Sequence, residues 1–180
     1  IVQAGAGLAS TYQDADYVAA GATLVQTAAE VYGSADLVLR VRGPEASEVS
    51  QLRKGQMLVA LLAPHRKEGL EALAAQGVTA FAMEWLPRIS RAQSMDVLSS
   101  QANLAGYKSV LIAANTYGRL MPMMMTAAGT IKAARVVIMG VGVAGLQAIA
   151  TAKRLGAVVE ATDVRPDTKE QVESLGAKFI

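Results

Sequence analysis

The 180-residue sequence contains no cysteine, few aromatic residues and little net charge. Without cysteine, the chain can form neither a disulfide framework nor a thiolate metal site. Its single histidine, His65, cannot build a zinc cluster by itself, so we expect no metal centre. Lys plus Arg total 17 and Asp plus Glu total 15, which leaves a net charge of +2. With no basic block and no aromatic platform, this composition argues against a nucleic-acid-binding protein.

Long apolar runs are also missing. No run reaches the roughly 20 residues that a membrane-spanning helix needs, and no signal peptide is visible. These patterns predict a soluble, intracellular protein without a membrane span of its own. The chain begins at Ile1 without an initiator methionine and ends at Ile180 inside an expected strand. We therefore expect it to be an internal piece of a longer protein.

The most informative stretch is residues 134–163. Val136–Met139 is a β-branched apolar run typical of a buried parallel strand. The hexapeptide GVGVAG at residues 140–145 follows, and then an apolar pattern with helical spacing. A second apolar run at Val158–Val159 leads to Asp163. This order of strand, glycine turn, helix, strand and acid predicts a dinucleotide-binding βαβ unit, although a glycine turn can also serve only to pack a helix on a sheet.

Each glycine of this turn has its own expected role. Gly140 permits the tight turn, Gly142 lets a pyrophosphate approach the backbone, and Gly145 allows the helix to pack closely on the strand. The start of the helix offers unpaired N–H groups and the positive end of its dipole to the phosphates. Asp163, 18 residues after Gly145, can accept both hydroxyls of the adenosine ribose and would repel a 2′-phosphate, which favours NAD(H). Arg165 could pair with a 2′-phosphate, so NADP(H) stays open.

Residues 1–125 also alternate strand and helix signals but carry no phosphate-loop glycines. Apolar runs such as Met57–Leu62 alternate with amphipathic patterns such as His65–Gln76, which predicts a parallel sheet covered by helices. One long helix is expected over about residues 92–117. The predicted fold is therefore of the α/β class, with two dinucleotide-fold-like βα domains joined by this long helix. The expected division places the long helix in the first domain and leaves residues 126–180 as the first half of a Rossmann domain.

Three segments between these elements stand apart. The basic segment Pro87–Arg91 follows a strand end, where the ligand crevice of an open α/β sheet lies, although taken alone it is also typical of a solvated loop. The methionine-rich segment Met121–Met125 is expected to provide adaptable packing. Residues 126–134 are expected to form a turn-rich connector.

The segment RISRAQSMDVLSS at residues 88–100, followed by LAGY at 104–107, resembles a known family. It is similar to the NAD(H)-binding component, domain I of the α subunit, of proton-translocating nicotinamide nucleotide transhydrogenase. That family shares its fold with alanine dehydrogenase. The resemblance extends along the whole chain, from QAGAG at residues 3–7 to Ile180, and is most discriminating between Arg88 and Ser99.

This resemblance implies roles for residues of that segment, which in the family lies against the nicotinamide and meets the facing NADP(H) domain. Arg88 would hold the carboxamide or phosphate side of NAD(H), and Gln93 would reach across to the neighbouring nucleotide. Asp96 and Ser99 would orient the carboxamide and so fix the ring face that is presented. At the glycine turn, the backbone N–H of Val143 would contact the pyrophosphate.

Hydride transfer between two nicotinamides needs rings held at reacting distance and shielded from water, but it needs no acid or base. On this basis Arg88, Gln93 and Asp96 are the expected catalytic residues. The full set of expected NAD(H)-binding residues is Arg88, Ile89, Ser90, Gln93, Asp96, Ser99, Gly140, Gly142, Val143, Gly145, Asp163, Val164 and Arg165.

The resemblance also implies partners and a location. NAD(H) would bind this chain, NADP(H) would bind a partner domain, and a membrane domain would couple hydride transfer to proton translocation. The component would form a homodimer. It would be peripheral, on the cytoplasmic side of the inner (plasma) membrane, or on the matrix side in a mitochondrion.

Two alternatives remain. Alanine dehydrogenase must deprotonate an amine and polarise an imine, so it needs a His and a Lys. Those positions of the family fall at Leu61 and Arg42 here, while His65 lies four residues further on and is typical of a surface helix. Because arginine does not replace lysine as a base, these differences favour transhydrogenase. A regulatory NAD(H)-sensing domain would keep the glycine turn and Asp163 but would not need residues 88–99.

Overall fold

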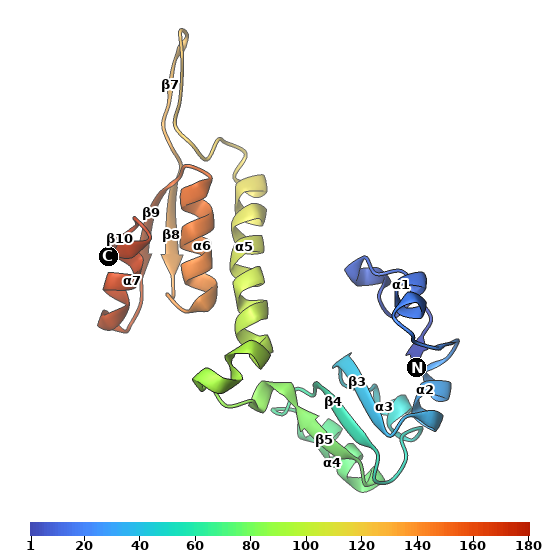
Figure 1. Ribbon diagram of the computed structural model, residues 1–180. Coiled ribbons are helices and arrows are strands. Elements are labelled where there is room, and N and C mark those ends of the chain that lie inside the picture. The colour runs from blue at the N-terminus through green and yellow to red at the C-terminus, as the bar shows by residue number, and fades with distance from the viewer. The chain divides into compact units, whose positions relative to one another are not determined.

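The computed structural model describes residues 1–180 and is shown in Figure 1. The chain separates into two compact units, residues 1–96 and residues 97–180. Both units contain parallel strands followed by helices, so the predicted α/β class with parallel sheets is confirmed. The sequence had suggested a division after residue 125. The long helix belongs with the second unit instead, because it packs along a helix of that unit over much of its length.

The first unit is built around a three-stranded parallel sheet. The five strands of this unit are β1 (Val2–Gln3), β2 (Leu24–Val25), β3 (Leu37–Arg42), β4 (Met57–Leu61) and β5 (Thr79–Ala82). Its helices are α1 (Asp14–Ala19), α2 (Ala28–Ser34), α3 (Ala46–Val49) and α4 (Lys67–Gln76), with 3-10 turns at Leu8–Ser10, Met83–Trp85 and Ser90–Met95. The sheet has the order β3-β4-β5, and β1 pairs with β2 in a separate parallel pair.

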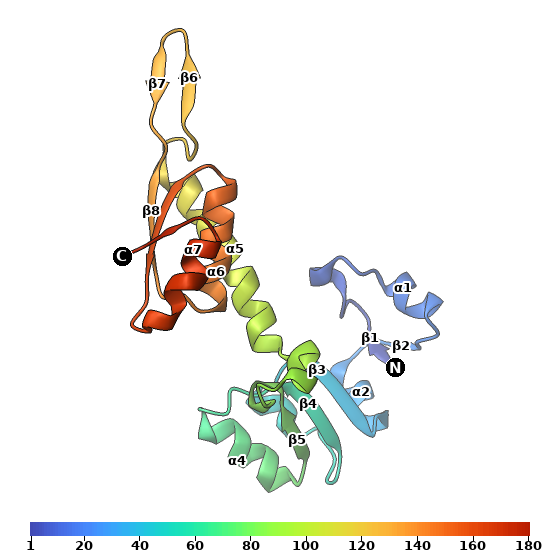
Figure 2. The ribbon, with the colours of Figure 1, turned by 60° about the vertical axis from the view of Figure 1, so that its left-hand side comes forward.

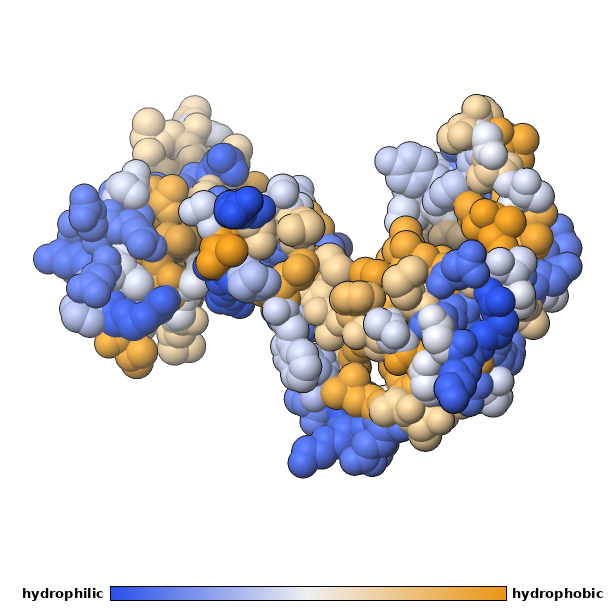
Figure 3. Space-filling view, turned by 60° about the horizontal axis from the view of Figure 1, so that its bottom comes forward, coloured by the Kyte–Doolittle hydropathy of each residue, from blue (hydrophilic) through white to orange (hydrophobic).

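Helices cover one face of the β3-β4-β5 sheet. Alternate strand residues point into the core on that face, where Leu58 and Ala60 of β4 are fully buried. The other face carries exposed apolar side chains, including Leu39 and Val41 of β3 and Phe81 of β5. Hydrophobic residues at the surface of the chain are coloured orange in Figure 3. The unit therefore has one well-packed layer and one apolar sheet face in contact with solvent.

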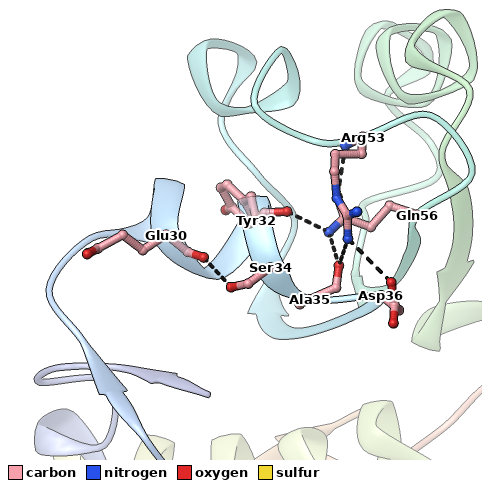
Figure 4. Close-up of polar contacts among 7 residues, drawn as sticks. All are labelled: Glu30, Tyr32, Ser34, Ala35, Asp36, Arg53 and Gln56. Carbon is pink, nitrogen blue, oxygen red and sulfur yellow. Dashed lines mark hydrogen bonds and ion pairs between the residues drawn. The ribbon is translucent and has the colours of Figure 1, made fainter.

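A buried glutamine ties the end of α2 to the start of β4. Gln56 is 3% exposed, and its side-chain amide nitrogen donates to the carbonyl oxygens of Tyr32 at 2.9 Å and Ala35 at 2.6 Å. Arg53 donates to the same Ala35 oxygen and to the carboxylate of Asp36, as Figure 4 shows. These bonds satisfy helix-end carbonyls that would otherwise be buried without a donor.

The second unit is a βαβ unit preceded by a long helix and a hairpin. Its helices are α5 (Val97–Tyr117), α6 (Val143–Arg154) and α7 (Lys169–Ser174), with a 3-10 turn at Pro166–Thr168. Its strands are β6 (Met124–Thr126), β7 (Gly129–Ile131), β8 (Arg135–Met139), β9 (Val158–Thr162) and β10 (Lys178–Phe179). The parallel sheet has the order β10-β9-β8, and α6 lies between α5 and this sheet (Figure 1). No helix of the chain combines the length and the apolar character that a bilayer span requires.

The methionine-rich region differs from expectation. Residues 124–131 form an antiparallel hairpin, β6 paired with β7, where a turn-rich connector had been predicted. The hairpin projects from the sheet (Figure 2), so Met123, Met124 and Met125 are exposed, Met125 to 72%. Within this region Met121 is buried, against the core of α5 and α6. The expectation of methionine packing was therefore wrong for residues 123–125, because a two-stranded ribbon has no second layer to pack against.

The long helix was predicted over about residues 92–117, and most of it is confirmed. It begins at Val97 rather than at Ala92, because Ser90–Met95 form a 3-10 turn that ends before Asp96. Asp96 therefore directly precedes α5, and Ser99 lies in the first turn of that helix.

Candidate functional site

The glycine turn joins β8 to α6 in the second unit. Gly140 has a φ of +94°, a conformation that residues with a Cβ rarely adopt. Gly142 caps the N-terminus of α6, and nothing lies within 4 Å of the position that a Cβ would take there. A Cβ on Gly145 would lie 1.9 Å from the carbonyl oxygen of Gly140. The turn therefore combines a left-handed bend, open space beside the backbone, and a helix pressed against the strand end.

The start of α6 has the features of an anion site. The first bond within the helix runs from the N–H of Leu146 to the carbonyl of Gly142 at 2.9 Å. The N–H groups of Val143 and Ala144 precede it, where a helix has no backbone acceptor for them, and the helix dipole adds positive potential. The helix is held firmly, because Ile149 and Ala152 are fully buried against the sheet.

Asp163 directly follows β9, and its carboxylate is hydrogen-bonded to the backbone of the glycine turn. One carboxylate oxygen accepts the N–H of Val141 at 2.7 Å, and the other accepts the backbone N–H and the Nε of Arg165, each at 2.9 Å. Arg165 also donates through Nη2 to the carboxylate oxygen that accepts the Val141 N–H, at 3.1 Å, and to the Val141 carbonyl at 3.3 Å. The side chain of Asp163 is only 7% exposed, whereas that of Arg165 is 60% exposed.

These hydrogen bonds set the charge of the aspartate. The side chain of Arg165, followed by the N–H groups of Val141 and Arg165, holds the pKa of the Asp163 carboxyl well below its usual range. The carboxylate is therefore ionised throughout the neutral range. Because the guanidinium of Arg165 is paired with Asp163, it already has an anionic partner and is not presented as an isolated cation for a 2′-phosphate. Val164, between them, is almost fully exposed.

The segment at residues 88–96 belongs to the first unit and follows the sheet. Arg88, Ile89, Ser90 and Gln93 are exposed, and Asp96 is half-buried. The 3-10 turn is anchored by the buried Ala92, whose N–H donates to the Ile89 carbonyl at 2.9 Å. The expected nicotinamide residues of this segment are therefore presented on a short, anchored turn and are accessible from solvent.

The structure also locates the positions that distinguish alanine dehydrogenase chemistry. Arg42 at the end of β3 is paired in register with Leu61 at the end of β4. The positions at which that chemistry would need a lysine and a histidine are thus neighbours at the carboxyl edge of the sheet, and they hold an arginine and a leucine. His65 lies in the loop before α4.

One structural carboxylate at the same edge was not singled out from the sequence. Glu84, in the 3-10 turn after β5, accepts the N–H of Leu62 at 3.1 Å and that of Ala63 at 2.7 Å. Ala63 has a φ of +48°, an uncommon conformation for a residue with a side chain. Burial raises the pKa of Glu84, but hydrogen bonds from its own N–H and from those of Ala63 and Leu62 outweigh burial and lower the pKa overall. A glutamate one turn after a strand carries no sequence signal for this contact.

Within the second unit, the structure brings together the glycine turn, Asp163 and Arg165. No group of His, Cys, Asp and Glu in residues 1–180 is arranged to hold a metal ion. The donor set at the turn, which consists of helix N–H groups, open space at Gly142 and a carboxylate, fits the pyrophosphate and ribose of a dinucleotide.

Known proteins share both halves of this chain. The alanine dehydrogenase/PNT N-terminal domain matches residues 1–105, and the C-terminal domain matches residues 109–180. An NAD(P) transhydrogenase subunit alpha polypeptide of Rhodospirillum rubrum is 56% identical over 186 residues, covering 100% of this chain and 48% of the relative. The crystal structure of transhydrogenase from Sinorhizobium meliloti is 59% identical with a TM-score of 0.94, covering 99% of this chain and 54% of that one.

A more distant relative is the alanine dehydrogenase of Mycolicibacterium smegmatis, which is 35% identical over 178 residues, covering 96% of this chain and 47% of the relative. The chain thus spans about half the length of the curated relatives that it matches. Since both domains of the family match in order and together cover nearly the whole chain, this chain belongs to the alanine dehydrogenase/PNT family.

Proposed function

We propose that this chain is the NAD(H)-binding component of a proton-translocating transhydrogenase. It would pass a hydride between NADH and NADP⁺ held on a partner domain. The observation that carries the proposal is the turn from Gly140 to Gly145, with Asp163 beside it, in a chain 56% identical to a transhydrogenase α subunit.

The pyrophosphate of NAD(H) would lie at the start of α6. The absence of a Cβ at Gly142 lets an anion approach the backbone, and the N–H of Val143 would donate to it. Asp163 would accept the hydroxyls of the adenosine ribose, and Arg165 would keep the carboxylate oriented while it does so. A carboxylate that is ionised and nearly buried repels a 2′-phosphate, which supports NAD(H) as the cofactor of this chain.

Residues 88–99 would orient the nicotinamide. We assign the carboxamide or phosphate side of the cofactor to Arg88, with Ile89 and Ser90 lining it. Asp96 and Ser99 would fix the carboxamide, and Gln93 would reach toward the nucleotide of the partner. The exposure of Arg88 and Gln93 supports this assignment, because a residue that meets a partner domain must be accessible before the partner binds.

Hydride transfer would require these side chains only to orient the nicotinamide ring. When bound, NADH supplies a hydride from its nicotinamide C4, and the matching ring of NADP⁺ accepts it without a proton changing hands. The residues of this chain would therefore hold the ring, select its face and exclude water, and none needs to act as an acid or base. Gln93 is suited to that task, since an amide can donate to one nucleotide and accept from another.

Alanine dehydrogenase chemistry is the second candidate, and the relative at 35% identity supports it. It is disfavoured by the pair Arg42 and Leu61, which meet in register where that reaction would need a lysine and a histidine. Under the transhydrogenase proposal no such pair is required.

The proposal includes partners beyond this chain. NADP(H) would bind a separate domain, a membrane domain would couple the transfer to proton movement, and two copies of this component would form a dimer. The Rhodospirillum rubrum relative is named as a subunit, which supports an assembly with further polypeptides. The component would be peripheral, on the cytoplasmic side of the inner membrane.

The test uses the full-length protein that contains this chain. It is mixed with NADH, NADP⁺ and a separately prepared NADP(H)-binding domain, and NADPH formation is followed. We expect transfer only when that domain is present, and no alanine-dependent reduction of NAD⁺. Turnover of alanine without the partner would refute the proposal and support the second candidate.

A variant isolates the role of Gln93. Gln93→Asn shortens the side chain by one methylene, so it should slow transfer while the affinity for NADH changes little. Gln51→Asn, at an exposed position outside the segment, is the matched control and should leave both unchanged. A large loss of NADH affinity with an unchanged transfer rate would contradict the assigned role.

A further inference from the structure

Gly106 lies on α5 directly against the backbone of the first turn of α6. It is buried, and a Cβ at this position would lie 2.1 Å from the carbonyl oxygen of Ala144 and 2.9 Å from its carbonyl carbon. No residue other than glycine can occupy the position at this helix separation, because the obstacle is backbone rather than a movable side chain. The contact is therefore a fixed point between the two helices.

The contact falls on the first turn of α6. Ala144 is the second residue of that helix and follows Val143 directly, so the carbonyl that Gly106 touches belongs to the turn that would bind the pyrophosphate. This turn cannot easily move away. Gly145 packs against the carbonyl of Gly140, and Ile149 is 0% exposed in the core beneath it. A larger residue at Gly106 would therefore displace α5 and leave α6 in place.

The same face of α5 leads to a proposed cofactor residue. Ser99 lies seven residues before Gly106, which is close to two helical turns, so the two positions share one face about 10 Å apart along the axis. Ala102, between them, is half-buried on this face, and Val110 continues it into the core. Ser99 itself is half-buried.

We propose that Gly106 is a positioning residue for the cofactor site. Its missing side chain sets the spacing between Ser99 on α5, at the nicotinamide end, and the pyrophosphate-binding start of α6. The inference rests on the proposed NAD(H) binding. It adds that the two ends of the cofactor are held by separate helices, and that the spacing of these helices is fixed at one backbone contact.

A specific consequence distinguishes this role from a structural one. ADP contains the adenosine and pyrophosphate and would contact only the α6 turn and Asp163. NADH would in addition contact α5 through Ser99. Displacement of α5 should therefore weaken NADH binding and spare ADP binding, whereas a general loss of structure would weaken both.

The experiment measures the affinities of the full-length protein and of its Gly106→Ala variant for NADH and ADP. For the variant we expect NADH to bind about tenfold more weakly and ADP to stay within about twofold of the unchanged protein. Gly69→Ala is the matched control, since Gly69 is a helical glycine with nothing within 4 Å of its Cβ position. Val110→Ala should lower stability without changing the NADH-to-ADP affinity ratio, because it removes volume and does not push α5 away.

Equal losses for NADH and ADP, or none for either, would overturn the inference. If Gly106→Ala does not fold, Ala102→Val applies a milder push on the same face and should change the affinity ratio in the same direction; an unchanged ratio there would overturn it equally. Failure of the unchanged protein to bind NADH would instead overturn the proposed function, and this inference with it.

Discussion

The three glycines of the turn predict three different results when each is replaced by alanine. For Gly142→Ala the backbone poses no obstacle, because φ is −87° and nothing lies within 4 Å of the new methyl group. The free energy of unfolding should change by less than about 0.5 kcal/mol. The methyl group would, however, occupy the space through which a pyrophosphate reaches the N–H groups of α6. Losing one hydrogen bond to a charged group costs about 1.5–3 kcal/mol, so NADH should bind roughly 10- to 150-fold more weakly.

Gly145→Ala should behave differently. Its methyl group would lie 1.9 Å from the Gly140 carbonyl oxygen, and ordinary contact begins near 3.4 Å, so strand end and helix must part by about 1.5 Å. Overpacking of this kind costs about 1–3 kcal/mol of stability. Because the displaced helix carries the pyrophosphate site, NADH affinity should fall as well. Gly140→Ala should lower stability through its φ of +94° alone.

The assay pairs denaturant unfolding with titration of NADH against the full-length protein. Gly33→Ala, a helical glycine of the first unit with nothing near its Cβ position, is the control and should change neither quantity much. Unchanged NADH affinity in Gly142→Ala would refute the placement of the pyrophosphate at this turn. A loss of stability in Gly142→Ala as large as that in Gly145→Ala would contradict the claim that a methyl group meets no obstacle at Gly142.

Further predictions concern carboxylates and one buried amide. Asp163→Ala should weaken NADH binding roughly 5- to 100-fold and, by releasing Arg165, raise the affinity for NADPH relative to NADH, which competition titration measures; an unchanged ratio would contradict the ribose assignment. The folded-state pKa of Glu84 lies below its ordinary value of 4.5, so its contribution to stability is present above that pH and is lost as the pH falls through the folded-state pKa. Glu84→Gln should therefore lower the free energy of unfolding by about 1 kcal/mol at pH 7. Below about pH 4.5 the free energy of unfolding of the variant should fall less steeply with pH than that of the unchanged protein, which denaturant midpoints measured across pH would show. Gln56→Ala removes the donor to the Tyr32 carbonyl and should lower the free energy of unfolding by about 1–3 kcal/mol. An unchanged denaturant midpoint would contradict the stabilising role of this buried hydrogen bond.

Local sequence patterns predicted much of the observed fold. The run from Val136 to Asp163 predicted strand, glycine turn, helix and strand in the observed order, because each element has its own periodicity and the glycines have specific backbone requirements. The alternation of strands and helices before residue 97 likewise predicted a parallel sheet, which the structure contains.

Contacts between distant residues were not predictable in this way. The hairpin at residues 124–131 has exposed methionines on short strands, so it lacks the alternating pattern by which a strand is recognised. In sequence, Gly106 is an ordinary helical glycine, and only the packing of α5 on α6 reveals why no Cβ fits there. The division after Asp96 has the same origin, since it depends on which helix α5 packs against.

At Asp163 the sequence indicated the residue but not its surroundings. A carboxylate after the second strand is typical of a ribose site, and this aspect of the interpretation needs only spacing. That one oxygen accepts the N–H of Val141 while Arg165 donates to both oxygens follows from three-dimensional geometry. The role of Asp163 in NAD(H) binding stays a prediction.

The most direct test of the central claim follows the hydride itself. The full-length protein is supplied with NADH deuterated at the transferred C4 position, NADP⁺ and the NADP(H)-binding domain, and the NADPH formed is examined by mass spectrometry. We predict that the deuterium appears in NADPH without dilution by solvent hydrogen, because the rings exchange a hydride directly and no side chain takes up a proton. NADPH that carries solvent hydrogen, or no NADPH at all, would contradict the account of this chain as the NAD(H) side of a transhydrogenase.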